Sequence, residues 1–263
     1  KISSFQITID GVEDIHNERK PHYRNKDSFA KITSNVDSLL KLGISVSIRI
    51  NTDPYTMEQA DELLDYFKEK GWLQYQNFKA YYALLRKEVP IKGENGEYSK
   101  EMFTQSSFFC TYLQKGLEKQ GCGKVMCQDY SVRSVLTNML LGKSTPYKSH
   151  FCGAQSGMII FDPLGDIYSC WDVVGQREYR VGHYMPDFVL EDTFADKWFD
   201  SRVSKFSCIK CKYVLFCGGG CLANAIRTTG NLQSGTCNDY PRLFNAEIKY
   251  IYNEKIKKGI DEN

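Results

Sequence analysis

The sequence lacks the features that mark several classes of protein. No apolar run approaches the roughly 18 residues of a membrane-spanning helix. The first residues, KISSFQITID, have neither the basic start nor the apolar centre of a secretory signal. The formal net charge is only +2, and the Lys and Arg residues are scattered among Asp and Glu. We therefore expect a cytoplasmic protein that has no nucleic-acid or membrane partner.

Cysteine is absent from the first part of the chain, yet ten cysteines follow from Cys110 onward. A reducing compartment disfavours disulfides, so this clustering indicates metal binding. Cys110 itself is interpreted as a small buried hydrophobic residue. An initiator Met is also absent, and the chain opens directly on a strand-like pattern. We expect the sequence to begin inside a longer protein.

The first part alternates strand and helix patterns. Period-2 alternation predicts strands at residues 5–10, 44–50 and 77–85. Helical spacing predicts one helix from Asp27 or Ser28 to Gly43 and a second one, capped by Thr56, up to Gly71. Short joints between these elements predict a right-handed parallel β/α arrangement.

Three regions are expected along the chain: a β/α region at 1–90, a linker at 91–145 and a cysteine-rich domain at 146–263. The first boundary follows from a Gly- and charge-rich loop at 86–105. Phe244, Ile248 and Ile251 recur at helical spacing and predict a closing, packed helix.

The stretch CIKCKYVLFCGGGC, residues 208–221, holds four cysteines and three consecutive glycines. Cysteines at C-x2-C spacing can turn both sulfurs toward one metal, and four thiolates suit zinc or an iron-sulfur cluster. Glycines with positive φ let backbone amides approach an anionic group. Four further residues extend the pattern: Cys152, Gly165, Cys170 and Cys237. A zinc ribbon that uses only the cysteines of the dense stretch stays open as an alternative, but it leaves these four unexplained.

The whole spacing resembles the SPASM domain, the C-terminal extension of many radical S-adenosylmethionine enzymes. The resemblance runs across roughly residues 150–240: a cysteine, then G-x4-C, then C-x2-C-x5-C-x3-C and a last cysteine. It implies an irregular domain with two auxiliary four-iron, four-sulfur clusters, and the fourth cysteine of the dense run crosses to the other cluster. Carried onto this sequence, the second cluster takes Cys208, Cys211, Cys217 and Cys237.

The first cluster, by the same resemblance, takes Cys152, Cys170 and Cys221. We favour Cys127 as its fourth ligand. Cys122, His150 and an open iron that binds substrate remain alternatives. The three glycines between Cys217 and Cys221 are then expected to let the chain pass between the clusters, while their amides soften charge on the sulfurs.

The β/α part resembles the later section of the partial barrel in the same enzymes. ITIDGVEDIHNER is similar to their S-x-D-G strand with a downstream H-N and Arg, with Thr8 in the place of the Ser. The resemblance implies that Thr8, Asp10, Arg19 and Asn51 bind S-adenosylmethionine at the ends of the strands. The cofactor-cleaving motif C-x3-C-x2-C does not occur in the sequence. A third cluster and the cofactor are therefore expected of a full-length parent, and this chain alone is expected to be inactive.

The resemblance implies an enzyme that modifies a peptide or protein side chain by radical chemistry. FDPLGDIYSCWDVVG resembles the matching segment of peptide maturases. In the related sulfatase maturases an Asp directly follows the matching cysteine and removes a proton; here Trp171 intervenes, and Asp172, one residue later, is the candidate general base. An electron donor such as flavodoxin or ferredoxin is a candidate partner. Two other functions stay open: a non-catalytic iron-sulfur module for electron transfer or peptide binding, and a zinc-binding interaction domain.

Overall fold

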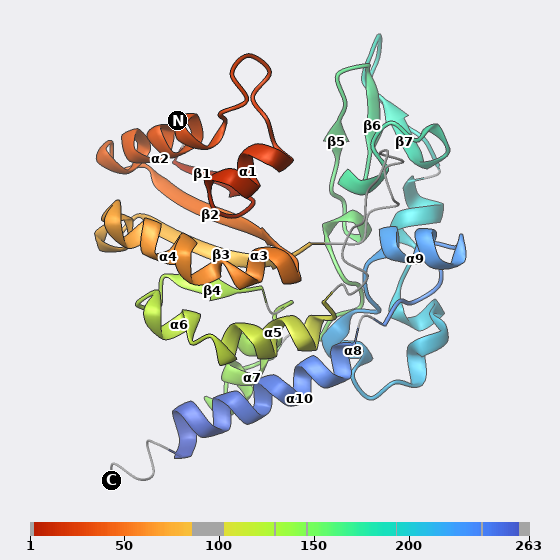
Figure 1. Ribbon diagram of the computed structural model, residues 1–263. Helices are drawn as coiled ribbons and strands as arrows, with labels where there is room; N and C mark the ends of the chain where they lie inside the picture. The colour runs from red at the N-terminus through yellow and green to blue at the C-terminus, as the bar shows by residue number, and fades with distance from the viewer. Residues whose placement is uncertain are drawn as a thin grey trace. The chain divides into compact units, whose positions relative to one another are not determined.

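The computed structural model describes residues 3–85, 103–128, 130–145, 147–192, 194–237 and 239–257. The chain divides into two compact units, Lys1–Ser131 and Val132–Asn263, and each is described by itself (Figure 1). Among the described residues no helix is long and apolar enough to cross a membrane.

The first unit is built on a four-stranded sheet in the order β1-β2-β3-β4, with every pair parallel. The strands are β1 (Ser4–Ile9), β2 (Ser45–Thr52), β3 (Phe78–Leu84) and β4 (Val125–Cys127). The helices of this unit are α1 (Glu13–Arg19), α2 (Phe29–Lys41), α3 (Pro54–Glu58), α4 (Ala60–Glu69), α5 (Gln105–Gln114) and α6 (Leu117–Gln120). The three strands expected from the sequence are confirmed, and so is the first predicted helix.

The two faces of this sheet differ in polarity because side chains alternate along each strand. Val46, Ile48 and Ile50 are buried on one face, where the ring of Phe78 also contacts Phe67 of α4. The hydroxyl of Tyr82 donates to the carbonyl oxygen of Ala60, 3.0 Å away. Helices therefore cover this apolar face. The opposite face carries polar side chains, which include Thr8 and Asn51, two of the residues predicted to bind the cofactor.

Three details of the first unit differ from the sequence prediction. The segment predicted as one helix up to Gly71 forms two helices, α3 and α4. Thr56 does not cap the helix that follows β2. Asp53 is the N-cap: its Oδ1 accepts from the amide of Thr56, and Thr56 Oγ1 accepts from the amide of Asp53, both at 2.9 Å. Pro54 can then occupy the first helical position, where it needs no amide hydrogen. Cys110, predicted to be buried, is exposed on α5.

The expected linker contains regular structure. Helices α5 and α6 and strand β4 all fall between residues 103 and 131, and β4 extends the parallel sheet. Residues 86–102 of the predicted 86–105 loop lie outside the described residues.

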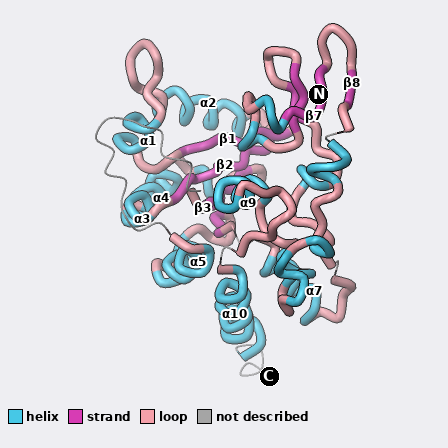
Figure 2. The backbone as a smooth tube through the Cα atoms, turned by 90° about the vertical axis from the view of Figure 1, so that its right-hand side faces the viewer, coloured by secondary structure: helices cyan, strands magenta, loops and turns pink. Residues whose placement is uncertain are grey.

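The second unit has a small antiparallel sheet and several short helices. The sheet order is β5 (Ile160–Phe161), β6 (Asp166–Tyr168), β7 (Arg180–His183) and β8 (Val189–Leu190), all short strands (Figure 2). The helices are α7 (Val132–Leu140), α8 (Val214–Cys217), α9 (Leu222–Thr229) and α10 (Tyr240–Ile251). Short 3-10 helices cover 153–155, 171–173, 177–179, 203–205 and 207–210, and short π-helices cover 194–199 and 252–257.

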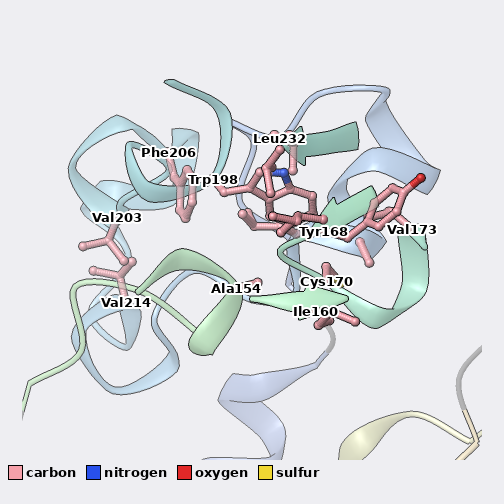
Figure 3. Packing of buried hydrophobic residues seen from close by; sticks show 14 residues of the cluster. Ala154, Ile160, Tyr168, Cys170, Val173, Trp198, Val203, Phe206, Val214 and Leu232 are labelled. Carbon is pink, nitrogen blue, oxygen red and sulfur yellow. The ribbon is translucent and has the colours of Figure 1, made fainter. Parts of the chain in front are cut away.

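The core of the second unit supports its cysteines. Trp198, Phe206 and Tyr168 are nearly completely buried at its centre, and Cys170 lies among the packed side chains (Figure 3). Partly buried residues at the edge of this core include Cys152, Cys208 and Cys221. Helix α10 confirms the predicted closing helix, although Ile248 is exposed, contrary to its expected place in the packed face.

Candidate functional site

Four cysteines line one pocket of the second unit, and they are the four predicted to hold the second cluster. Cys208 lies on a 3-10 turn, Cys217 ends α8, and Cys237 precedes α10. The pocket is small, with a volume of about 30 Å³, and is partly open to solvent. Its lining residues are Cys208, Cys211, Tyr213, Val214, Cys217, Gly219, Thr236, Cys237, Tyr240 and Pro241.

The three glycines after Cys217 allow backbone segments to pack against one another beside this pocket. Gly218, Gly219 and Gly220 have φ values of 76°, 85° and 84°, which side-chain-bearing residues rarely adopt. A Cβ on Gly218 would lie 2.3 Å from the carbonyl oxygen of His150, and one on Gly220 would lie 2.0 Å from that of Thr236. Close packing of the backbone is a reason for glycine that the sequence pattern did not show.

Gly219 links two chain segments that line the pocket. The amide of Thr236 donates to the carbonyl oxygen of Gly219 at 2.9 Å and so holds the residue before Cys237 beside the glycine run. Burial raises the pKa of the Cys217 thiol to about 11, although a hydrogen bond from the Gly219 amide opposes this shift. That amide supports the sulfur in the way expected from the sequence.

The sulfurs of this set are close enough to influence one another. Cys237 and Cys208 both raise the pKa of Cys217, after burial and the Gly219 amide. Burial, with smaller contributions from Cys211 and Cys237, raises the pKa of Cys208. A bound cationic centre would reverse this, since it stabilises thiolates. The donor set therefore fits a group that takes four thiolates.

Cys221 groups with different partners. Burial raises the pKa of the Cys170 thiol to about 12, and the amide of Asp172 opposes this by donating to the sulfur. The carboxylate of Asp172 and the thiols of Cys221 and Cys152 add to the rise. Cys221 is not among the residues that line the four-cysteine pocket. Cys221 and Cys152 are thus both near enough to act on the pKa of Cys170, while the crossover itself stays a prediction.

The described residues contain no group of three or more His, Cys, Asp or Glu side chains arranged to hold a single metal ion. A zinc site needs four sulfurs at about 2.3 Å from one point. Each cysteine of a four-iron cluster can instead bind a separate iron, so its sulfurs stand further apart.

The fourth ligand of the first set stays a prediction. Cys127 is buried in β4, where its register partner is Tyr82, and Cys122 is exposed, so both belong to the first unit. His150 belongs to the second unit and precedes Cys152 by two residues. Its Nδ1 lies 3.0 Å from Ser149 Oγ, and burial lowers its pKa, as do Arg202 and Lys148.

Asp172 lies beside the first cysteine set. Its amide bonds to Cys170, and its Oδ2 lies 4.0 Å from Nη2 of Arg227 on α9. Its side chain retains 22% exposure, so the carboxylate can be reached from outside. The neighbouring Trp171 is largely exposed. Sequence reasoning missed Arg227, because no local pattern connects it to Asp172.

Two of the predicted cofactor residues lie together at the ends of β1 and β2. The Nδ2 atom of Asn51 donates to Asp10 Oδ1 at 2.7 Å, and Lys20 Nζ lies 3.0 Å from Asp10 Oδ2. The backbone amide of Asp10 donates to His16 Nδ1 at 3.0 Å. Burial lowers the pKa of His16, which favours the neutral ring that this acceptor role requires. Asp10 is thereby held in one position.

The other two predicted cofactor residues are placed differently. Thr8 pairs with Arg49 of β2 and lies two residues before Asp10. Arg19 pairs with Asp53, with Nη2 2.6 Å from Oδ2, and it does not contact Asp10 in the structure. Lys20 takes the place beside Asp10 instead. Sequence reasoning missed Lys20 because the resemblance directed attention to the arginine.

The chain thus has a parallel sheet with polar strand ends and a second unit rich in cysteines, and anaerobic sulfatase-maturating enzymes are among the known proteins that it resembles. The chain is 22% identical over 268 residues to a serine-type anaerobic sulfatase-maturating enzyme of Bacteroides thetaiotaomicron. The match covers 93% of this chain and 62% of that enzyme. It is 24% identical to a cysteine-type anaerobic sulfatase-maturating enzyme of Clostridium novyi, over 96% of this chain and 64% of that enzyme. These relatives confirm the resemblance predicted from the sequence. No protein-family model matches the chain.

Solved structures show the same fold. Native anSMEcpe with bound AdoMet has a TM-score of 0.62 at 18% identity, over 99% of this chain and 70% of that one. SuiB of Streptococcus suis has a TM-score of 0.57 at 15% identity, over 89% of this chain and 54% of that one. The chain spans between 57% and 64% of the length of its curated relatives.

Proposed function

We propose that this chain is the C-terminal portion of a radical S-adenosylmethionine enzyme that modifies a peptide or protein side chain and holds two auxiliary four-iron, four-sulfur clusters. The gathering of cysteines into two sets, with Cys221 apart from the dense run, carries this proposal. A zinc ribbon of the dense run would need Cys221 at the pocket, and the pocket lining does not include it.

The residues that would hold the second cluster are Cys208, Cys211, Cys217 and Cys237. Those that would hold the first are Cys152, Cys170 and Cys221, with Cys127 as the favoured fourth ligand. When bound, such clusters accept an electron or anchor a substrate. The amide of Gly219 donates to the Cys217 sulfur and would stabilise it as a thiolate.

The role we propose for Asp172 is removal of a proton from the modified side chain. Its carboxylate lies near Arg227 and remains partly exposed, so it can meet a substrate without a major rearrangement. Asp10 and Asn51, hydrogen-bonded to each other, would contact the ribose and methionine parts of S-adenosylmethionine, with Thr8 and Arg19 nearby in the sequence pattern. Full turnover would need the cofactor-cleaving cluster of the parent protein.

A peptide substrate is the partner that the relatives favour. One related structure is native anSMEcpe with AdoMet and the Kp18Cys peptide, and another is SuiB bound to its precursor peptide SuiA. For this chain a peptide or protein substrate is part of the proposal. A non-catalytic module remains the competing function, and a cysteine triplet upstream of Lys1 in the parent gene would decide between them.

The cluster content is tested by anaerobic reconstitution of the chain, followed by iron, sulfide and zinc analysis. Two full clusters require about eight irons and about eight acid-labile sulfides per chain. Stoichiometric zinc without sulfide in freshly prepared anaerobic protein would contradict the proposal.

A further inference from the structure

Exposed apolar side chains gather on the small sheet of the second unit. Phe161 on β5 and Leu164 in the turn before β6 are 55% and 85% exposed. The segment that joins β7 to β8, together with β8 itself, adds four more exposed residues: Met185, Phe188, Val189 and Leu190. Single exposed apolar residues are ordinary on a protein surface, but a contiguous group of them marks an interaction site.

Contacts within the sheet join these residues into one surface. The ring of Phe161 meets the ring of Tyr184 edge to face, with centroids 5.1 Å apart. The amide of Tyr184 donates to the carbonyl oxygen of Gly165 at 2.8 Å. A Cβ on Gly165 would lie 3.3 Å from the Cβ of Met185, so the turn that contains Leu164 lies beside Met185. The β5–β6 turn and the β7–β8 connection are therefore neighbours.

Strand β8 forms one edge of this sheet (Figure 2). Among the described residues, β7 is the only strand that pairs with it. The amide of Glu191 donates toward β7, to the carbonyl oxygen of Val181 at 2.9 Å. Backbone groups point to alternate sides along an antiparallel strand, so the N–H and C=O groups of Leu190 point away from β7. An edge of this kind can take up an extended chain as one more strand.

The surroundings of this edge are acidic. Residues 160–192 contain seven Asp and Glu residues, two Arg and no Lys. Arg180 already lies between two carboxylates, with Nη1 3.2 Å from Asp166 and Nη2 2.7 Å from Glu191. Asp187 and Asp192 are exposed on either side of β8 in the sequence. A chain that pairs with β8 would therefore meet negative charge at both ends of the strand.

We propose that β8 and the apolar residues beside it bind a basic, extended segment of the peptide substrate as an added strand. This site is called the β8 surface, and it is formed by residues 185–192 together with Phe161 and Leu164. The inference rests on the proposed function, because the substrate supplies the segment. It adds a sequence requirement to that function: Lys or Arg beside apolar residues, at a distance from the side chain that is modified. Backbone hydrogen bonds would hold the segment, and the carboxylates would select its charge.

A second copy of the chain fits the β8 surface less well. Antiparallel pairing of two β8 edges about a two-fold axis would bring the carboxylates of both copies together, and like charges across a pair of strands are destabilising. Charges at edge strands commonly prevent such self-pairing. The same carboxylates that attract a basic segment therefore oppose a dimer through this edge.

The test uses the full chain, prepared anaerobically, and a dye-labelled peptide of alternating Lys and Val. Binding is followed by fluorescence anisotropy at 50 and 200 mM salt. The double variant Asp187→Lys, Asp192→Lys is compared with Glu18→Lys, Glu69→Lys, which changes net charge equally at exposed residues of α1 and α4 in the first unit. We expect the β8 variant to weaken binding about tenfold at low salt and the control less than about twofold. The milder Asp187→Asn, Asp192→Asn should weaken it about threefold.

Two further peptides separate strand addition from simple attraction of charge. A Lys-Val peptide with N-methyl groups on alternate residues keeps its charge but loses the N–H groups along one edge. We expect it to bind about tenfold more weakly than the unmodified peptide, because the backbone hydrogen bonds to β8 are lost. A peptide of alternating Glu and Val should bind more weakly still.

Iron content is determined on the same samples, and binding is measured whether or not clusters are present. A chain without clusters would contradict the proposed function but would leave the result for the β8 surface intact. Equal affinities for the two Lys double variants would overturn the docking proposal, and so would an N-methylated peptide that binds as tightly as the unmodified one. A dimer of the wild-type chain that excludes the peptide would identify a second copy as the occupant and would also overturn it.

Discussion

Replacement of Gly220 by Ala tests the packing beside the four-cysteine pocket. Gly220 has a φ of 84°, and the left-handed conformation costs a residue with a Cβ about 1–2 kcal/mol. The added Cβ would stand 2.0 Å from the carbonyl oxygen of Thr236, which is 1.0 Å short of the 3.0 Å that real Cβ atoms keep. The obstacle is backbone, so it cannot rotate away. Overpacking of this kind adds about 1–3 kcal/mol.

Gly230 supplies the matched control. It ends α9 with a φ of 69°, and a Cβ there would meet nothing within 4 Å. Gly230→Ala should therefore cost only the conformational part, about 1–2 kcal/mol, and Gly220→Ala about 2–5 kcal/mol in total. Because Thr236 precedes Cys237, relief of the clash should also move Cys237 away from the pocket. Iron per chain should then fall toward half in Gly220→Ala and stay unchanged in Gly230→Ala.

The assay is anaerobic urea unfolding followed by intrinsic fluorescence, with iron analysis of the same samples. Trp198, fully buried in the second unit, provides a local signal. Equal loss of stability and equal iron content in the two variants would refute the reasoning, because crowding at Gly220 would then have no effect.

Three further predictions concern the cysteine sets, pH and activity. Cys211→Ala should mainly remove the second cluster and Cys152→Ala the first, measured by electron paramagnetic resonance after reduction; loss of the same signal in both variants would show that the ligand assignment is wrong. Burial lowers the pKa of His16 below its ordinary 6.5, with a smaller lowering by Lys20 and an opposing contribution from Asp10, so the unfolded chain takes up a proton at higher pH than the folded chain. The stability that neutral His16 contributes is present above pH 6.5 and lost as pH falls below it; urea midpoints at several pH values should therefore decline more steeply in wild type than in His16→Gln, and parallel curves would contradict this. The chain alone, without C-x3-C-x2-C, should form no 5'-deoxyadenosine from S-adenosylmethionine with a strong reductant, and chromatographic detection above background would show that one of its own clusters binds the cofactor.

Strand and helix positions in the first unit were predictable because they depend on local alternation. The pattern of residues 44–50 places Val46, Ile48 and Ile50 on one face in any parallel sheet with a covered side, and the structure buries all three. Strand β4 was not predictable, because three residues are too few to show a period. It becomes a strand through its pairing with β3, which is a long-range contact.

Among the residues predicted to bind the cofactor, one contact was likewise predictable from the sequence and another was not. Asp10 ends one predicted strand and Asn51 directly follows the next, and adjacent parallel strands bring their carboxyl ends together, so their contact could be expected from order alone. Whether Arg19 or Lys20 is the partner of Asp10 could not be predicted from the order of the elements. These neighbours point in different directions from the end of α1, and Arg19 meets Asp53, which lies 34 residues further along the chain.

For the cysteines, the sequence by itself determined the inventory and the spacing, and with them the expectation of two sets of sulfur ligands. C-x2-C spacing lets Cys208 and Cys211 turn toward one pocket because the turn between them is local. The membership of each set came only from the resemblance to a family, whereas the tertiary structure places Cys237 in that pocket and brings Cys221 and Cys152 near enough to act on the pKa of Cys170. The physical reason is that this division depends on the path of the backbone through Gly218, Gly219 and Gly220, where three left-handed residues pass within contact distance of His150, Phe206 and Thr236. Such contacts join segments far apart in the chain, and spacing alone carries no information about them.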